Sequence, residues 1–133
     1  MNLRNLLVCG NSFDETQLNS HRRGWFIGQF MSKNDGLKCT DDVEVKWGVH
    51  PVGEVRKSPA ASDLATTVSI LIEGKFFLDF PGLGRSVTLQ RSGDYVIWAP
   101  RVSHSWEAVE ASTILTVRWP SAVNDRPSNG NNN

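Results

Sequence analysis

The sequence is short of the features that mark several common classes of protein. Its 133 residues include only two cysteines, Cys9 and Cys39, so we expect two reduced thiols and no disulfide framework. Fourteen basic residues balance fourteen acidic ones, which gives no indication of a nucleic acid or an anionic membrane as partner. No apolar run is long enough to span a bilayer, and the N-terminus lacks a signal-peptide pattern. We therefore expect a soluble, cytoplasmic protein with a single domain.

Helical periodicity is also scarce, with residues 16–23 (TQLNSHRR) as the one short candidate. Elsewhere apolar and polar residues alternate with period two, as in strands. Turn signals separate these segments at spacings of about eight to twelve residues, which is typical of an antiparallel sandwich or barrel. The fold class predicted is all-β, with strands in residues 43–49, 66–80 (two strands in a tight hairpin at Glu73 and Gly74), 86–90, 94–100, 104–109 and 113–119.

Composition divides the chain into three parts. Residues 1–42 are expected to form N-terminal strands and loops that pack on the barrel, and residues 43–121 to form the barrel itself. Residues 34–42 and 56–65 are interpreted as loops. The tail, residues 122–133, is rich in Asn, Pro and Gly and has no apolar residue after Val123, so we expect it to be disordered.

A spaced motif lies in the second half of the chain. Gly93 is followed by five residues, then by Ala99, Arg101 and His104. This order resembles the second motif of the cupin superfamily, in which a proline and a glycine stand at the positions of Ala99 and Arg101. The resemblance covers about residues 43 to 120 and implies a single-domain, RmlC-like jelly-roll β-barrel that holds its ligand in the barrel mouth.

The first cupin motif is degenerate. Gly53 and Gly74 fit its two ends, but Pro59, Ala61 and Thr67 stand where that motif has two histidines and a glutamate that bind metal. None of these three side chains is a usual metal ligand. We therefore expect no bound metal and no other cofactor.

Two further stretches are similar to those of short bacterial single-domain cupins. They are WGVHPVGE at residues 47–54 and TVRWPS at residues 116–121. Proteins of this group are sometimes labelled signal peptidase. Such a peptidase needs a serine nucleophile with a lysine base and a membrane anchor, and the sequence offers no such arrangement.

The resemblance makes His104 the candidate catalytic residue. Strand alternation places Trp106 and Ala108 on the same face as His104, toward the barrel lumen. Thr67 in place of the ligand glutamate implies that Ser69 and Leu71 also point inward. Tryptophans would supply an aromatic wall, and an arginine on the last strand could bind an anion or form a structural ion pair. The predicted ligand-binding residues are Trp47, His50, Thr67, Ser69, Leu71, Trp98, Trp106 and Arg118.

A metal site with another ligand set is the alternative. His50 and Glu54 lie four residues apart, so on an uninterrupted strand they would share a face. With His104 they would make a two-histidine, one-carboxylate set suited to divalent iron, zinc or manganese. Pro51 and Gly53 interrupt the strand and argue against this arrangement.

Three functions follow from these residues. The favoured one is a metal-independent isomerase, cyclase or lyase that acts on a small hydrophobic molecule, with His104 as general acid or base. The second is a non-catalytic module that binds the same kind of ligand, and the third a metal-dependent cupin such as a dioxygenase. We also expect a homodimer, because residues 23–30 (RGWFIGQF) are apolar enough to cross to a partner.

Overall fold

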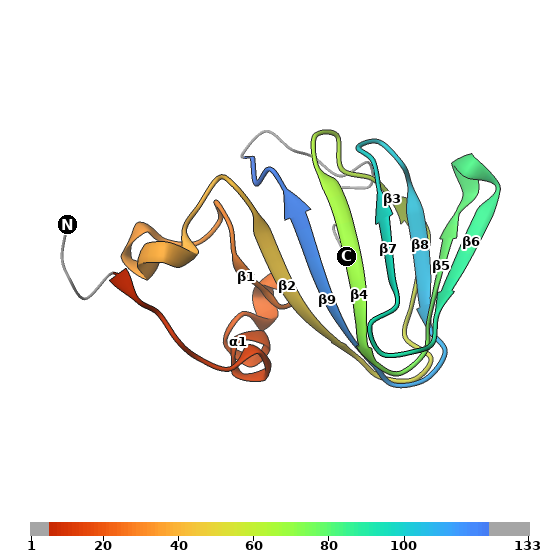
Figure 1. The fold of residues 1–133 in the computed structure, drawn as a ribbon, viewed down its shortest axis with the longest axis horizontal. Coiled ribbons are helices and arrows are strands. Elements are labelled where there is room, and N and C mark those ends of the chain that lie inside the picture. Colours follow the sequence, from red (N-terminus) through yellow and green to blue (C-terminus); the bar gives the residue numbers. More distant parts are fainter. Residues whose placement is uncertain (1–5, 123–133) are drawn as a thin grey trace.

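Nine strands form two antiparallel sheets that face each other in a computed structural model, which describes residues 6–122. The five-stranded sheet has the order β1-β2-β9-β4-β7, and the four-stranded sheet the order β3-β8-β5-β6 (Figure 1). The five-stranded sheet contains β1 (Trp25–Ile27), β2 (Glu44–His50), β4 (Thr66–Glu73), β7 (Tyr95–Trp98) and β9 (Ser112–Trp119). The four-stranded sheet contains β3 (Val55–Ala60), β5 (Phe76–Phe80), β6 (Arg85–Leu89) and β8 (His104–Ala108). The predicted all-β jelly roll is confirmed.

Within the described part of the chain, helical structure is confined to short segments. The helix α1 (Ser12–Leu18) is followed by three 3-10 helices, η2 (Ser20–Arg22), η3 (Lys33–Lys38) and η4 (Pro81–Leu83). The Asn11 side chain caps α1 by accepting hydrogen bonds from the amides of Phe13 and Asp14. This helix lies beside β2, outside the two-sheet barrel (Figure 1). The N-terminal part of the chain therefore covers one side of β2 with a helix, the strand β1 and loops, and α1 overlaps the short helical candidate in residues 16–23. Among residues 6–122, no helix is long and apolar enough to cross a membrane.

Two strand predictions need correction. Residues 56–65 were interpreted as a loop, but Val55–Ala60 form β3, which pairs with β8 across an irregular register. The tight hairpin at Glu73 and Gly74 is also wrong, because β4 and β5 belong to different sheets. Gly74 has φ +106°, and a methyl group on it would lie 2.4 Å from the carbonyl oxygen of Ala111. The glycine is thus needed where the chain passes from one sheet to the other.

The core lies between the two sheets. Alternating residues of β4, β5, β8 and β9 point inward, as the period-two pattern predicts. The buried apolar cluster consists of Leu71, Phe76, Leu78, Phe80, Leu89, Trp98, Trp106, Ala108 and Ile114. The tail beyond residue 122, predicted to be disordered, lies outside the described residues.

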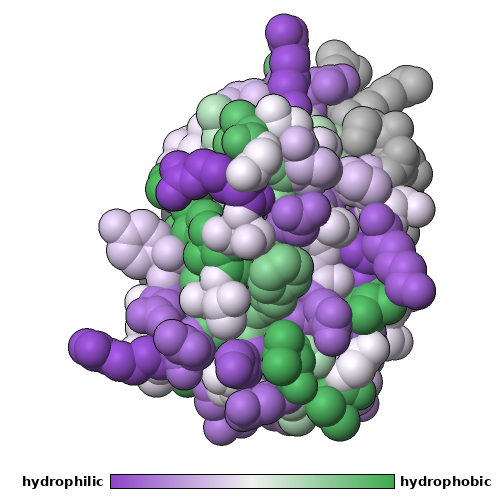
Figure 2. Space-filling model, turned by 90° about the vertical axis from the view of Figure 1, so that its right-hand side faces the viewer, coloured by the Kyte–Doolittle hydropathy of each residue, from purple (hydrophilic) through white to green (hydrophobic). Residues whose placement is uncertain are grey.

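The N-terminal segment that was expected to cross to a partner pairs within its own chain. Trp25 and Ile27 of β1 pair with β2. On the face beyond β5 and β6, hydrophobic side chains form several groups separated by polar ones (Figure 2). The homodimer stays a prediction.

A buried ion pair fastens the start of β2 to the end of β9. The Arg118 guanidinium contacts the Glu44 carboxylate, and both residues are at most 8% exposed. The Ser121 hydroxyl donates a hydrogen bond of 2.8 Å to Glu44, and Arg118 lies 4.3 Å over the Trp25 ring. Removing one member of such a pair leaves a buried charge without its counterion.

We expect Glu44→Leu to lower the free energy of unfolding by about 3–5 kcal/mol, because Arg118 then remains buried and charged. The double variant Glu44→Leu with Arg118→Met should recover most of that loss. Urea unfolding of both variants tests this expectation. A double variant no more stable than Glu44→Leu alone would contradict it.

Candidate functional site

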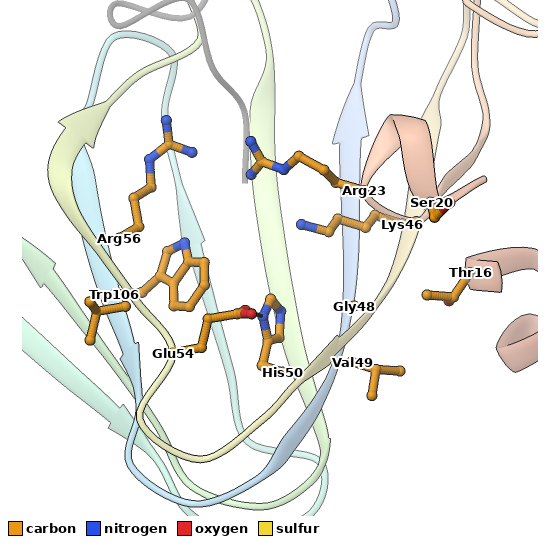
Figure 3. Close-up of a pocket in the computed structure, with 12 residues that line it drawn as sticks. Thr16, Ser20, Arg23, Lys46, Gly48, Val49, His50, Glu54, Arg56 and Trp106 are labelled. Carbon is orange, nitrogen blue, oxygen red and sulfur yellow. Dashed lines mark hydrogen bonds and ion pairs between the residues drawn. The ribbon is translucent and has the colours of Figure 1, made fainter.

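A pocket of about 510 Å³ opens between the N-terminal segment and the barrel (Figure 3). Its walls come from α1 and the turn after η2, from β2 and β3, and from one indole of β8. The lining residues are Thr16, Ser20, Arg23, Gly24, Lys46, Gly48, Val49, His50, Glu54, Val55, Arg56 and Trp106. Three of these lining residues, Arg23, Lys46 and Arg56, carry groups that are positively charged at neutral pH or titrate near it. Glu54 is the one carboxylate among the lining residues.

Alternation along β2 determines which of its side chains are buried beside the pocket. Lys46, Gly48 and His50 face inward and are buried, whereas Trp47 and Val49 alternate with them and are more exposed. Gly48 leaves space that a larger residue would fill. A methyl group on it would lie 2.7 Å from His50 Nε2 and 3.4 Å from Lys46 Cε. The imidazole and the lysine side chain therefore share the space over Gly48.

His50 and Glu54 form a pair at the base of the pocket. Residues 51–54 turn the chain from β2 into β3 and bring Glu54 Oε1 to 2.5 Å from His50 Nδ1. Burial lowers the pKa of His50, and the nearby Lys46 lowers it further, against the opposing effect of Glu54. A neutral imidazole that donates from Nδ1 to the carboxylate keeps its lone pair on Nε2, the atom over Gly48.

Lys46 brings an amine into a buried position. The residue is 4% exposed, and burial lowers the pKa of its amine to about 7, with the positive charges of Arg23 and Arg118 adding to the effect. Its Nζ lies 5.9 Å from the centre of the Trp25 ring. No salt bridge to this amine is present within residues 6–122. Lys46 is therefore divided between its charged and neutral forms near pH 7.

Two arginines add positive charge to the pocket from opposite sides. Arg23 points into it from the same side as Lys46, and Arg56 lies across from them, above Trp106 in the view of Figure 3. Partial burial lowers the pKa of both guanidinium groups, which still remain charged at neutral pH. Such a concentration of positive charge favours an anionic ligand.

The structure brings only some of the predicted site residues to this pocket. His50 and Trp106 line it, with their ring centres 4.7 Å apart. His104 is buried on the same face of β8 as Trp106, as alternation predicts, but it does not line the pocket. Its ring lies 4.6 Å from that of Trp98 and 6.2 Å from that of Phe80. The catalytic role of His104 stays a prediction.

Four other predicted residues fill the barrel or hold its strands. Thr67 and Ser69 are buried on β4, and Ser69 Oγ is 3.1 Å from Thr116 Oγ1. Leu71 and Trp98 belong to the apolar core. None of the four lines the 510 Å³ pocket. The aromatic side chains expected to wall a ligand cavity thus pack largely against one another.

Two further predicted residues, Trp47 and Arg118, do not form a wall of the barrel lumen. Trp47 faces out of the barrel and packs edge-on against Phe13 of α1 at 5.4 Å, so its placement on the lumen wall is wrong. Arg118 forms the ion pair with Glu44 described above and does not line the pocket. Of the two roles considered for Arg118, the geometry matches the structural ion pair.

The alternative metal site is not assembled. His50 and Glu54 do meet, but His104 packs with Phe80 and Trp98 instead of joining them. No group of three His, Cys, Asp or Glu side chains within residues 6–122 is suited to hold a metal ion. The alternative metal-ligand set of His50, Glu54 and His104 is therefore wrong, because the three side chains do not come together. The expectation that no cofactor binds stays a prediction.

The three cationic residues of the pocket, Arg23, Lys46 and Arg56, were not predicted from the sequence. Lys46 could have been found, because it lies two residues before Gly48 and four before His50 on an alternating strand. Arg56 was placed in a supposed loop. Arg23 gave no signal, since it reaches the pocket from a separate part of the chain.

Gly48→Ala tests the need for space between Lys46 and His50. The added methyl group would meet His50 Nε2, so we expect a loss of about 1–3 kcal/mol of stability from crowding, with a shifted imidazole resonance of His50 in NMR spectra. Gly82→Ala is the matched control, because a methyl group there meets nothing within 4 Å. An unchanged His50 resonance in Gly48→Ala would contradict the expectation.

The buried amine predicts a pH-dependent stability. The cost of burying charged Lys46 is present below its folded pKa of about 7 and is relieved as pH rises toward the ordinary value of 10.5. His50 stays neutral in this window, because its pKa lies below 6.5, and the neighbouring arginines stay charged. Between pH 7 and 9 the wild type should therefore gain about 1–3 kcal/mol relative to Lys46→Met in urea unfolding. Parallel pH profiles of the two proteins would refute this.

The fold has many relatives among solved structures, although no protein-family profile and no curated protein sequence matches the chain. A cupin protein from Bacteroides fragilis is 22% identical, with 72% of this chain and 86% of that one covered and a TM-score of 0.55. KdgF from Halomonas sp. is 19% identical over 62% and 74% of the two chains, with a TM-score of 0.56. The lyase DddQ from Ruegeria pomeroyi is 16% identical over 66% and 43%, with a TM-score of 0.55. The chain therefore has the cupin fold, as its spaced motifs predicted.

Proposed function

We propose that the pocket binds a small organic anion and acts on it as a metal-independent isomerase, cyclase or lyase. The observation that carries this proposal is the convergence of Arg23, Lys46 and Arg56 around the His50–Glu54 pair. The positive charge favours a carboxylate over the hydrophobic ligand expected from the sequence. The volume of about 510 Å³ accommodates a small molecule.

His50 is the acid–base residue in this proposal, in place of His104. Its Nε2 lies over Gly48, which lines the pocket, and its Nδ1 is held by a carboxylate. When Nε2 takes a proton from the bound substrate, Glu54 stabilises the imidazolium that forms. The proton then returns to another atom of the same substrate, or to a leaving group. This orientation by Glu54 gives the ring one tautomer and one direction.

Among the structural neighbours, DddQ from Ruegeria pomeroyi is a DMSP lyase, so a barrel of this fold carries lyase chemistry in that protein. The likeness at 16% identity concerns the fold alone. The proposal for this chain rests on its own pocket.

Anion binding is tested with a panel of small carboxylates and their neutral amides, by isothermal titration calorimetry. We expect the carboxylates to bind and the amides to bind at least about tenfold more weakly, because the cationic groups lose their counterion. Arg56→Gln should weaken carboxylate binding by about tenfold. Arg85→Gln, on exposed β6 away from this pocket, is the control. Equal affinity for carboxylates and amides would refute the proposal.

Catalysis and simple binding are separated by His50→Gln. Glutamine keeps a donor and an acceptor but transfers no proton at neutral pH. An enzyme should lose turnover by about 100-fold or more and keep its ligand affinity within a few-fold. A non-catalytic binding module, the alternative function, shows no turnover in either protein. Turnover that survives in His50→Gln and falls in His104→Gln would return the acid–base role to His104.

A further inference from the structure

The Lys46 amine combines two properties that general acid–base work by His50 does not use. It is buried in the barrel wall yet lines the pocket, and no carboxylate forms a salt bridge with it among the described residues. Arg23 and Arg118 surround it with positive charge, which disfavours a proton on its nitrogen. Lysines in such settings are nucleophiles at neutral pH.

The neighbours of the amine suit addition to a carbonyl group. Its Cε and His50 Nε2 lie over the same glycine, so the imidazole can exchange protons with a group bound to Nζ. The Trp106 indole forms another wall of the pocket, and its N–H has no hydrogen-bond partner within residues 6–122. Arg23 and Arg56 stand on opposite sides of the space, so their guanidinium groups could contact a carboxylate bound between them (Figure 3). An aldehyde or ketone that also carries a carboxylate would match all these groups.

We propose that Lys46 forms an imine with the carbonyl carbon of a small oxo acid bound in this pocket. The inference rests on the proposed function and deepens it by naming the substrate class. The arginines would hold the carboxylate, and Lys46 would reach the carbonyl beside it.

The step balances without a further reactant. The neutral amine attacks the carbonyl carbon, so a C–N bond forms and the electron pair of the C=O π bond moves to oxygen. His50 transfers a proton from nitrogen to that oxygen, which gives a carbinolamine. The C–O bond then breaks, and the oxygen leaves as water with both amine protons. The resulting imine, once protonated, draws electrons from the adjacent carbon, which favours the proton removal or bond cleavage of an isomerase or lyase.

Reductive trapping with cyanoborohydride tests the inference on the full-length protein. Pyruvate, glyoxylate and acetoacetate serve as probes at pH 7, and lactate serves as the carboxylate without a carbonyl group. Intact-mass measurement and peptide mapping then show which amine carries the reduced adduct. We expect modification of Lys46 at least about tenfold faster than that of the exposed lysines Lys33 and Lys57.

Lys46→Arg is the matched variant, because it keeps the positive charge but forms no imine. It should bind the oxo acids and lactate and give no adduct in the pocket. Mapping of the wild type decides the question even where this variant fails to fold. An adduct confined to the N-terminal amine or to exposed lysines would overturn the inference.

Calorimetry on the same proteins keeps the two proposals apart. Binding of the probes without an adduct on Lys46 would overturn the imine and leave the anion site standing. Absence of binding by every oxo acid and by lactate would overturn both. Lactate binding that equals pyruvate binding, with the Lys46 adduct formed from pyruvate alone, would support both.

Discussion

The site depends on the burial of the Lys46 side chain in a region that already holds other positive groups. Moving an ammonium ion out of water is costly, and the positive charges of Arg23 and Arg118 add to that cost. The amine avoids this desolvation cost by losing its proton, because the pKa of Lys46 is lowered to about 7, and not by pairing with a carboxylate. Glu54, the one carboxylate in the pocket lining, is engaged with His50. Such an arrangement lowers the stability of the fold and favours a bound negative charge.

The architecture explains how such residues come together. The inward face of β2 presents Lys46, Gly48 and His50 in a row, and the glycine keeps the two functional side chains from being pushed apart. The turn into β3 returns Glu54 to His50. Farther along the same face, Glu44 pairs with Arg118. Lys46, two residues from Glu44 on that face, has no salt bridge to a carboxylate within residues 6–122.

Much of the fold could be predicted because period-two alternation and spaced glycines are local signals. Burial on β4 and β8 follows the alternation residue by residue. β3 was missed because Ser58 and Pro59 interrupt its pattern, and pairing with β8 outweighs that weak propensity. The prediction of a tight hairpin at Gly74 was wrong because a turn between two strands gives the same sequence signal whether the strands belong to one sheet or to two. Arg101 shows a similar limit. It stands at the glycine position of the cupin motif and adopts φ +69°, a conformation that its residue type does not indicate.

The candidate site was harder to predict because the motif histidine, His104, does not line the pocket. His104 occupies the expected motif position, but Phe80 and Trp98 pack around it. Aromatic side chains fill the space around His104, and the pocket lies instead where the α1–η2 segment stands beside β2. Arg23 reaches the pocket only through this long-range packing, which no local pattern of residues 16–24 reports. His50 is different, because its strand, its glycine neighbour and its glutamate partner all lie within ten residues of one another. The proposed chemistry therefore lies on β2, the strand that the N-terminal segment covers, and not at the motif histidine. There a carboxylate contacts the imidazole of His50, and the Lys46 amine lines the same pocket.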